Sequence, residues 1–216
     1  MNTSSLSPKL GGRRSKYVLW TLMALATISV ILYTEVPLLH QTREQARLHD
    51  LRWILIPHIV AGVLAFITAP AQFSTRLRNR HLRLHRIVGR LYVGSVFVAA
   101  PLAVWSTAYA AYPKAIYFRA AILIQASCWL ITTALAFRAA LRRQIPMHRL
   151  WMVRSYAVTF TFVLTRVLQP IPAWNRFGRF GLAAAIVCIT LLAILTPEIA
   201  RLWQRLVSPP PAPTLG

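Results

Sequence analysis

Acidic residues are scarce in this chain, and their scarcity excludes several classes of membrane protein. Only four Asp and Glu residues stand against 25 Lys and Arg residues. The chain therefore lacks the paired membrane carboxylates of aspartic proteases and the acidic spans common in proton-coupled carriers. The motifs H-E-x-x-H and G-x-S-x-G are also missing. Their absence makes the common metalloproteases and serine hydrolases poor candidates, so a hydrolase is not expected.

Cysteine is scarce as well. Cys128 and Cys188 lie within apolar stretches, and the sequence has no C-x-x-C pair. Covalent c-type haem attachment and a dithiol redox site are therefore excluded. A zinc or copper site would depend on histidines alone, with His81, His85 and His148 as the local candidates.

Long apolar stretches make up most of the sequence. The chain is 56% hydrophobic and 13% charged, whereas soluble domains average about 25% charged residues. Several stretches approach the ~20 residues that cross a bilayer as a helix. The sequence therefore predicts an all-α polytopic membrane protein with six transmembrane helices in one domain, residues 17–206. The predicted spans are 17–36, 53–73, 87–110, 118–141, 150–171 and 180–203.

The basic residues indicate the orientation of these spans. They cluster in the tail 1–16, in the loop after the second span and in the loop after the fourth. By the positive-inside rule these segments are cytoplasmic, as are both chain termini. The proline-rich end, 207–216, is predicted to be a disordered tail. Because the charge of +21 gathers beside apolar spans, anionic lipid is the expected partner and nucleic acid is not.

A His-Arg pair occurs twice, at His85 and at His148, each time before a long apolar stretch. In both copies an Arg two residues before a Tyr follows. Because both stretches enter from the cytoplasmic side, we expect parallel helices with the two imidazoles at similar depth. Such a pair is able to ligate one b-type haem iron, with arginines near its propionates. The other residues of this predicted site are Arg86, Gly89, Arg90, Tyr92, Arg149 and Arg154.

The same pattern has a simpler interpretation. Histidine, arginine and tyrosine at the end of a membrane helix also anchor it among lipid headgroups. Gly89, four residues after His85, opens a groove that fits either a flat macrocycle or a closely packed helix. Both interpretations remain open at the level of the sequence.

A second predicted polar site lies toward the opposite membrane face. His58 falls inside the second span, and Gln125 and Arg166 are expected at a comparable depth. Polar groups at this depth are costly and often functional. The three residues are candidates for binding a quinone headgroup, a haem propionate or a small anion. A structural hydrogen-bonded cluster is the alternative.

Several of these motifs together indicate a family. Residues 52–168 resemble an uncharacterised family of bacterial inner-membrane proteins, a predicted membrane domain of unknown function. The resemblance implies a multi-pass protein of the bacterial inner membrane. The residues that carry it are His58 to Gly62, Pro70 to Phe73, His85 to Tyr92, His148, Trp151, Met152, Arg154 and Arg166.

A looser similarity is to six-helix diheme cytochromes b. In that pattern helices three and five hold one haem, which matches His85 and His148, whereas helices two and four hold the other. Here His58 lies in the second span, but the fourth span, 118–141, contains no histidine. The leading hypothesis is therefore electron transfer through a single haem b, with quinone as a further cofactor. The alternative is a haem-free transporter or a lipid- or quinone-interacting protein, and the sequence leaves the redox partner and oligomeric state open.

Overall fold

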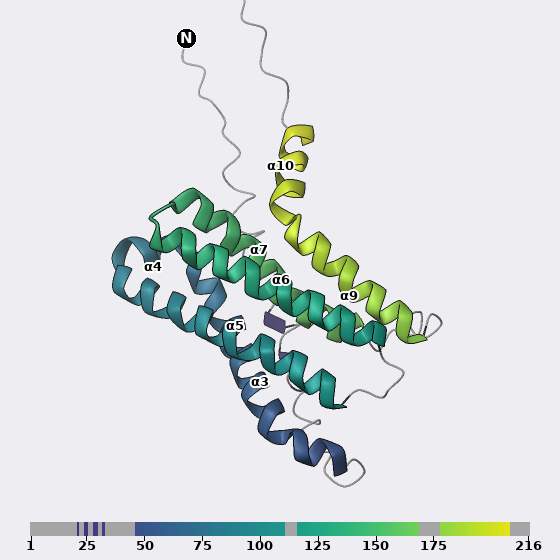
Figure 1. Ribbon diagram of the computed structural model, residues 1–216. Helices are drawn as coiled ribbons and strands as arrows, with labels where there is room; N and C mark the ends of the chain where they lie inside the picture. The colour runs from purple at the N-terminus through teal and green to yellow at the C-terminus, as the bar shows by residue number, and fades with distance from the viewer. Residues whose placement is uncertain are drawn as a thin grey trace, which may run out of the picture. The chain divides into compact units, whose positions relative to one another are not determined.

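The computed structural model describes residues 21, 24–25, 28–29, 32, 46–110, 116–168 and 178–207 (Figure 1). The chain divides into two compact units, Met1–Gln41 and Thr42–Gly216, and the account below concerns the second. The predicted basic tail, most of the predicted first span and the tail from residue 208 lie outside the described residues.

Helices make up nearly all of the described residues of this second unit, which confirms the predicted all-α class. Short turns separate several of them. The helices are α3 (Ala46–Gln72), α4 (Thr75–Arg80), α5 (Leu82–Ala110), α6 (Ile116–Leu141), α7 (Ile145–Leu168), α9 (Gly178–Ile194) and α10 (Thr196–Val207).

Three described helices are long and apolar enough to cross a membrane, over Arg52–Gln72, Leu82–Ala108 and Ile116–Leu141. A bent pair, α9 with α10, raises the number to four if it counts as one span. Helix α7 is not among them, because arginines and hydroxyl residues interrupt its apolar sequence. The protein is thus polytopic with three to four candidate spans in the described part, fewer than the six predicted.

The predicted span 180–203 is bent in the structure and counts as one candidate span only if its two helices are taken together. The structure breaks it at Leu195, where α9 ends and α10 continues at an angle of 58°. Pro197 explains the break, since it has no N–H to donate to the preceding turn. Figure 1 shows α10 leaving the direction of α9, and α10 contacts the first half of α7 through the Glu198–Arg154 pair.

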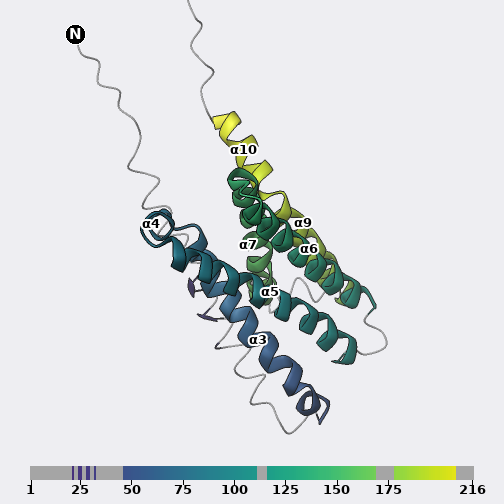
Figure 2. The same ribbon diagram turned by 60° about the vertical axis from the view of Figure 1, so that its left-hand side comes forward.

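Helices α3 and α5 pack closely through small residues (Figures 1 and 2). Ala61, Ala65 and Ala69 line one side of α3, and Ala99 and Ala103 lie buried on α5. Small side chains let two membrane helices approach closely. The opposite side of α3 is apolar and exposed, as expected for a surface that faces lipid. Its residues are Trp53, Ile56, Val60, Leu64 and Ile67.

A tight turn reverses the chain between α6 and α7. The Arg143 N–H donates to the Ala140 carbonyl over 3.0 Å, and the Gln144 N–H donates to the Ala139 carbonyl over 2.9 Å. This is the Schellman arrangement that ends helices, and Arg143 has the left-handed φ of 57° that it requires. The turn makes α7 run back along α6.

Helix α9 completes the packing on α6 and α7. Tyr117 of α6 and Phe180 of α9 meet edge to face at 5.6 Å between ring centres. Ala121, Ala183 and Ile186 continue this contact as a buried cluster. Because the residue numbers rise together along the contact, α6 and α9 run in the same direction. The direction therefore alternates through α3, α5, α6 and α7, and α9 follows α6.

Candidate functional site

The two predicted histidines lie on parallel helices in register. The Tyr92 hydroxyl of α5 lies 2.6 Å from the Ser155 hydroxyl of α7, a pair separated by 63 residues in the chain. His85 and His148 have the same separation, so they lie at matching positions about two turns earlier on these helices. The two imidazoles also interact electrostatically with each other. The structure therefore brings His85 and His148 to one region, as their matched positions predict.

Helix α6 holds the ring of His148. Its Nδ1 lies 2.9 Å from the carbonyl oxygen of Ala136, and because a carbonyl only accepts, the Nδ1–H donates. In the neutral ring this leaves Nε2 with a free lone pair. An Nδ1–H bonded to a backbone carbonyl is also the usual support of a metal-ligating histidine. The α6–α7 turn is responsible, since it places Ala136 beside His148.

His85 lies in a different environment. Its Nδ1 is buried, and no hydrogen-bond partner reaches it among the described residues. The guanidinium groups of Arg78 and Arg86 also interact electrostatically with this ring. Short helix α4, whose start is capped by the Ser74 hydroxyl accepting from the Leu77 N–H, connects α3 to α5 and brings Arg78 close. His85 thus offers a buried ring nitrogen in a cationic region.

The groove predicted beside Gly89 contains the side chain of Gln72 from α3. A β-carbon built on Gly89 would lie 3.0 Å from the Gln72 Oε1. The amide of Gln72 also donates to the carbonyl of His85 over 3.3 Å. In this structure Gly89 therefore allows a close approach of α3. A closely packed helix was one of the two interpretations of the sequence at this position. Gln72 was not predicted as part of the site, and its polar side chain at the end of an apolar span was the signal.

Tyr92 belongs to a buried hydroxyl network that joins three helices. Besides Ser155, its hydroxyl contacts the Thr159 hydroxyl at 3.0 Å. Thr159 accepts from the Trp129 Nε1–H over 2.8 Å, and Ser155 contacts Thr133 at 2.7 Å. The fully buried Tyr92 therefore joins α5 to α7. Ser155 and Thr159 of α7 extend the network to α6. The sequence placed Tyr92 beside a haem and did not predict the network, although serine and threonine repeat along α7.

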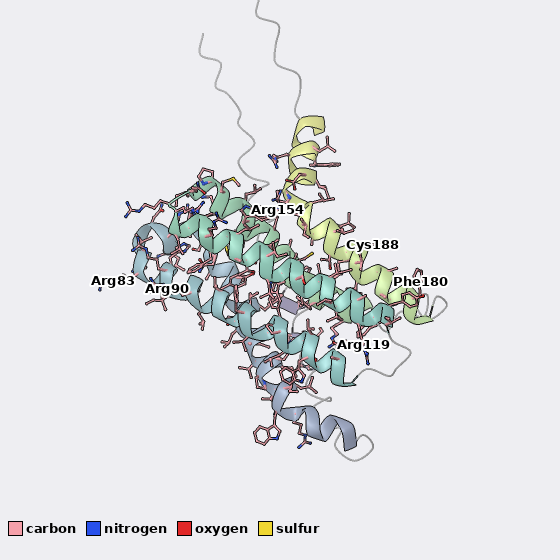
Figure 3. The ribbon with its side chains drawn as sticks, viewed as in Figure 1. Arg83, Arg90, Arg119, Arg154, Phe180 and Cys188 are labelled. Atoms are coloured by element: carbon pink, nitrogen blue, oxygen red, sulfur yellow. The ribbon has the colours of Figure 1, made fainter. Side chains whose placement is uncertain are left out.

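Arg154 has a partner that the sequence did not predict. Its guanidinium forms an ion pair with Glu198 of α10, and Arg201 reaches the same carboxylate oxygen at 2.9 Å. The guanidinium also lies 4.4 Å from the ring centre of Trp151. Arg154 thus pairs with α10, beside which it lies (Figure 3), although the sequence assigned it to a propionate. The other assigned arginines, Arg86, Arg90 and Arg149, are exposed.

We expect Arg154→Gln to lower the melting temperature of the purified protein by a few degrees. The substitution removes one of the two cations that pair with the Glu198 carboxylate, and it removes the cation–π contact with Trp151. Arg149→Gln is the matched control, because Arg149 is an exposed arginine of the same helix. Equal melting temperatures for the two variants would contradict a structural role of the ion pair.

Two residues of the second predicted site bond to neighbouring helices. The Nδ1–H of His58 donates to the carbonyl of Ala99 on α5 over 2.9 Å. The amide of Gln125 donates to the Thr161 hydroxyl on α7 over 2.8 Å. Arg166 is exposed near the end of α7. His58 and Gln125 thus each join a neighbouring helix, which is what the structural alternative predicts.

Metal-binding side chains are sparse in the described ranges. No group of three or more His, Cys, Asp or Glu residues occurs there in positions to hold a metal ion. A protein-only zinc site needs three or four such ligands. A haem needs only two axial ligands, because the porphyrin supplies four nitrogens.

Comparison with protein-family models assigns the chain to a family. The model of a family described as "Predicted membrane protein (DUF2306)" matches residues 55–202. No curated protein and no solved structure matches the chain.

Proposed function

We propose that this chain, which belongs to DUF2306, a family of predicted membrane proteins of unknown function, is a redox protein of the bacterial inner membrane that binds one haem b. The proposed ligands of the iron are His85 and His148. The observation that carries the proposal is the register of α5 and α7, which gives the two imidazoles matching positions on parallel helices.

The proposed topology has six spans with both termini in the cytoplasm. The alternating directions of α3, α5, α6 and α7 support it, as does the position of the arginines of α4 and of the α6–α7 turn on one side. Helix α7 is the fifth span despite its polar residues, because most of its hydroxyl residues face other helices and its exposed arginines lie near its two ends. Ser155, Thr159 and Thr161, for example, are all buried.

The donor atoms fit a bis-imidazole haem. His148 has Nδ1 bonded to a carbonyl and Nε2 free for the iron, whereas the Nδ1 of His85 is buried without a partner among the described residues and its Nε2 is the proposed donor. The groove beside Gly89 accepts a macrocycle only if the flexible side chain of Gln72 turns away. The Tyr92–Ser155 contact does not interfere, since it lies roughly 10 Å further along both helices.

A bound haem would supply one-electron chemistry, and the chain would hold and tune it. Ala136 fixes the ring of His148. The exposed arginines Arg86, Arg90 and Arg149 are available to the propionates, whereas Arg154 remains with Glu198. The buried network around Tyr92 limits the access of water from within the bundle.

Absorption spectroscopy tests the proposal. Protein purified from haem-replete cells is expected to show a Soret band and, after reduction, a sharp α-band. Low-spin signals in electron paramagnetic resonance should show two imidazole ligands. A folded, monodisperse and colourless preparation that also fails to take up added haem would refute the proposal.

We further expect Gly89→Leu to reduce haem occupancy about tenfold or more, because the new side chain fills the groove that the macrocycle needs. Gly94→Leu is the matched control on the same helix, since nothing lies within 4 Å of a β-carbon built there. Haem per protein, measured by the pyridine haemochrome spectrum, gives the result. Equal haem content in both variants would show that the groove beside Gly89 is not the haem-binding site.

The alternative, a haem-free transporter or a quinone- or lipid-binding protein centred on His58, Gln125 and Arg166, is supported less well. The hydrogen bonds of His58 and Gln125 go to neighbouring helices, which gives both residues a structural role.

A further inference from the structure

Helix α10 combines two faces of opposite character. Leu195, just before it, and Ile199, Leu202 and Trp203 form an apolar face, and the side chains of the last three are 48%, 58% and 67% exposed. Arg201 lies on the opposite side of the helix, and Glu198 lies at the edge of the apolar face. A strongly amphipathic helix with exposed leucine and tryptophan is typical of helices that lie within a membrane surface.

The geometry places α10 where a membrane surface is expected. Helix α9 has 17 residues and is therefore about 26 Å long, slightly less than the ~30 Å hydrocarbon core. Helix α9 runs in the same direction as α6, which ends at the arginine-rich turn before α7. The chain then bends by 58° into α10. The bend therefore lies at the cytoplasmic boundary of the membrane.

The ion pair with α7 fixes this position. Glu198 bonds to Arg154 of α7 and to Arg201 of its own helix. If α10 continued across the membrane, Arg201, which is 60% exposed, would enter the hydrocarbon. With α10 along the surface, Arg201 lies at the depth of the lipid phosphates instead. Its charge is complementary to anionic lipid, and the cationic cytoplasmic loops add to this attraction.

We propose that α10 lies along the cytoplasmic membrane surface, with Ile199, Leu202 and Trp203 inserted among anionic lipids and Arg201 at their headgroups. The Arg154–Glu198 pair sets the angle at which α10 enters the surface. This role does not depend on haem, since no residue of α10 belongs to the His85–His148 site.

Depth measurements with spin labels test the proposal. Full-length protein with Cys128→Ser and Cys188→Ser would carry a single label at Ile199→Cys, Trp203→Cys or Arg201→Cys, in nanodiscs of phosphatidylglycerol and phosphatidylethanolamine. We expect severalfold more collision with oxygen than with a water-soluble nickel chelate at positions 199 and 203. The label at position 201 should show the reverse. Leu202→Cys, on the same face, replaces any labelled variant that does not elute as a single species.

Each other pattern overturns the proposal. Preferential collision with nickel at all three positions would place α10 in water, and preferential collision with oxygen at all three would place it across the membrane. Spin–spin broadening with few collisions at 199 and 203 would show a second copy of the chain on this face. In nanodiscs of phosphatidylcholine alone, the oxygen preference at position 199 should fall. An unchanged preference would overturn the selectivity for anionic lipid.

Discussion

His148→Ala is expected to abolish the reduced α-band of the purified protein, and His85→Ala is expected to do the same. In the proposed site each imidazole would supply one bond to the iron, so the loss of either would remove low-spin haem. The effect should be nearly complete for His148, because its ring is already oriented by the carbonyl of Ala136. Haem content per protein and the reduced spectrum give the result.

His81→Ala is the matched control for both variants. His81 is an exposed histidine at the end of α4, in the same arginine-rich region as His85. Its replacement should leave the spectrum unchanged. A His148→Gly variant with added imidazole should recover the α-band, which separates the loss of a ligand from a general failure to fold. Retention of the wild-type α-band in both His85→Ala and His148→Ala would reject these ligands.

Tyr92→Phe is expected to destabilise the protein by about 1–2 kcal/mol. The substitution keeps the ring and removes only the hydroxyl that contacts both Ser155 and Thr159. Hydrogen bonds between membrane helices contribute modestly, on average about 0.6 kcal/mol and at most about 1.7 each. The loss here reaches the upper part of that range because two buried hydroxyls lose a partner at once. Reversible unfolding in mixed detergent micelles measures the change.

Tyr117→Phe serves as the control for Tyr92→Phe. Tyr117 is exposed, and its contact with Phe180 is made by the ring, so removal of its hydroxyl should have little effect. Combining Tyr92→Phe with Ser155→Ala should cost less than the sum of the two single changes, since both remove the same contact. An additive result would show that the two residues do not act through this hydrogen bond.

The family assignment and the helical class followed from the sequence. Local apolar composition is sufficient to predict the helical class, whereas the family resemblance rested on the motifs around His58, His85 and His148. The helix bounds of α3, α5 and α6 agree with the predicted spans to within a few residues at most ends. The start of α3 is the exception, since the helix begins at Ala46, before the apolar stretch. The break at Leu195 was missed because the stretch around Pro197 is still apolar on average.

The partners of the site residues were harder to predict. Arg154 was assigned to a cofactor because its partner, Glu198, lies far along the chain and the pairing depends on how α10 folds back on α7. Gln72 was missed for the same reason, since its contact with Gly89 depends on the packing of α3 against α5. Long-range pairs of this kind leave little trace in a single sequence.

The sequence by itself determined that this chain is a helical membrane protein, because transfer of apolar residues into lipid depends on composition and length alone. The repeated His-Arg pairs also determined that His85 and His148 occupy equivalent positions at the starts of two helices. Only the tertiary structure decided that α5 and α7 lie in register, through Tyr92 and Ser155, and that Ala136 fixes the ring of His148. It also decided that Gly89 faces Gln72 and that Arg154 holds α10. These features depend on side chains from different helices meeting, which the packing of the bundle sets and the local sequence does not.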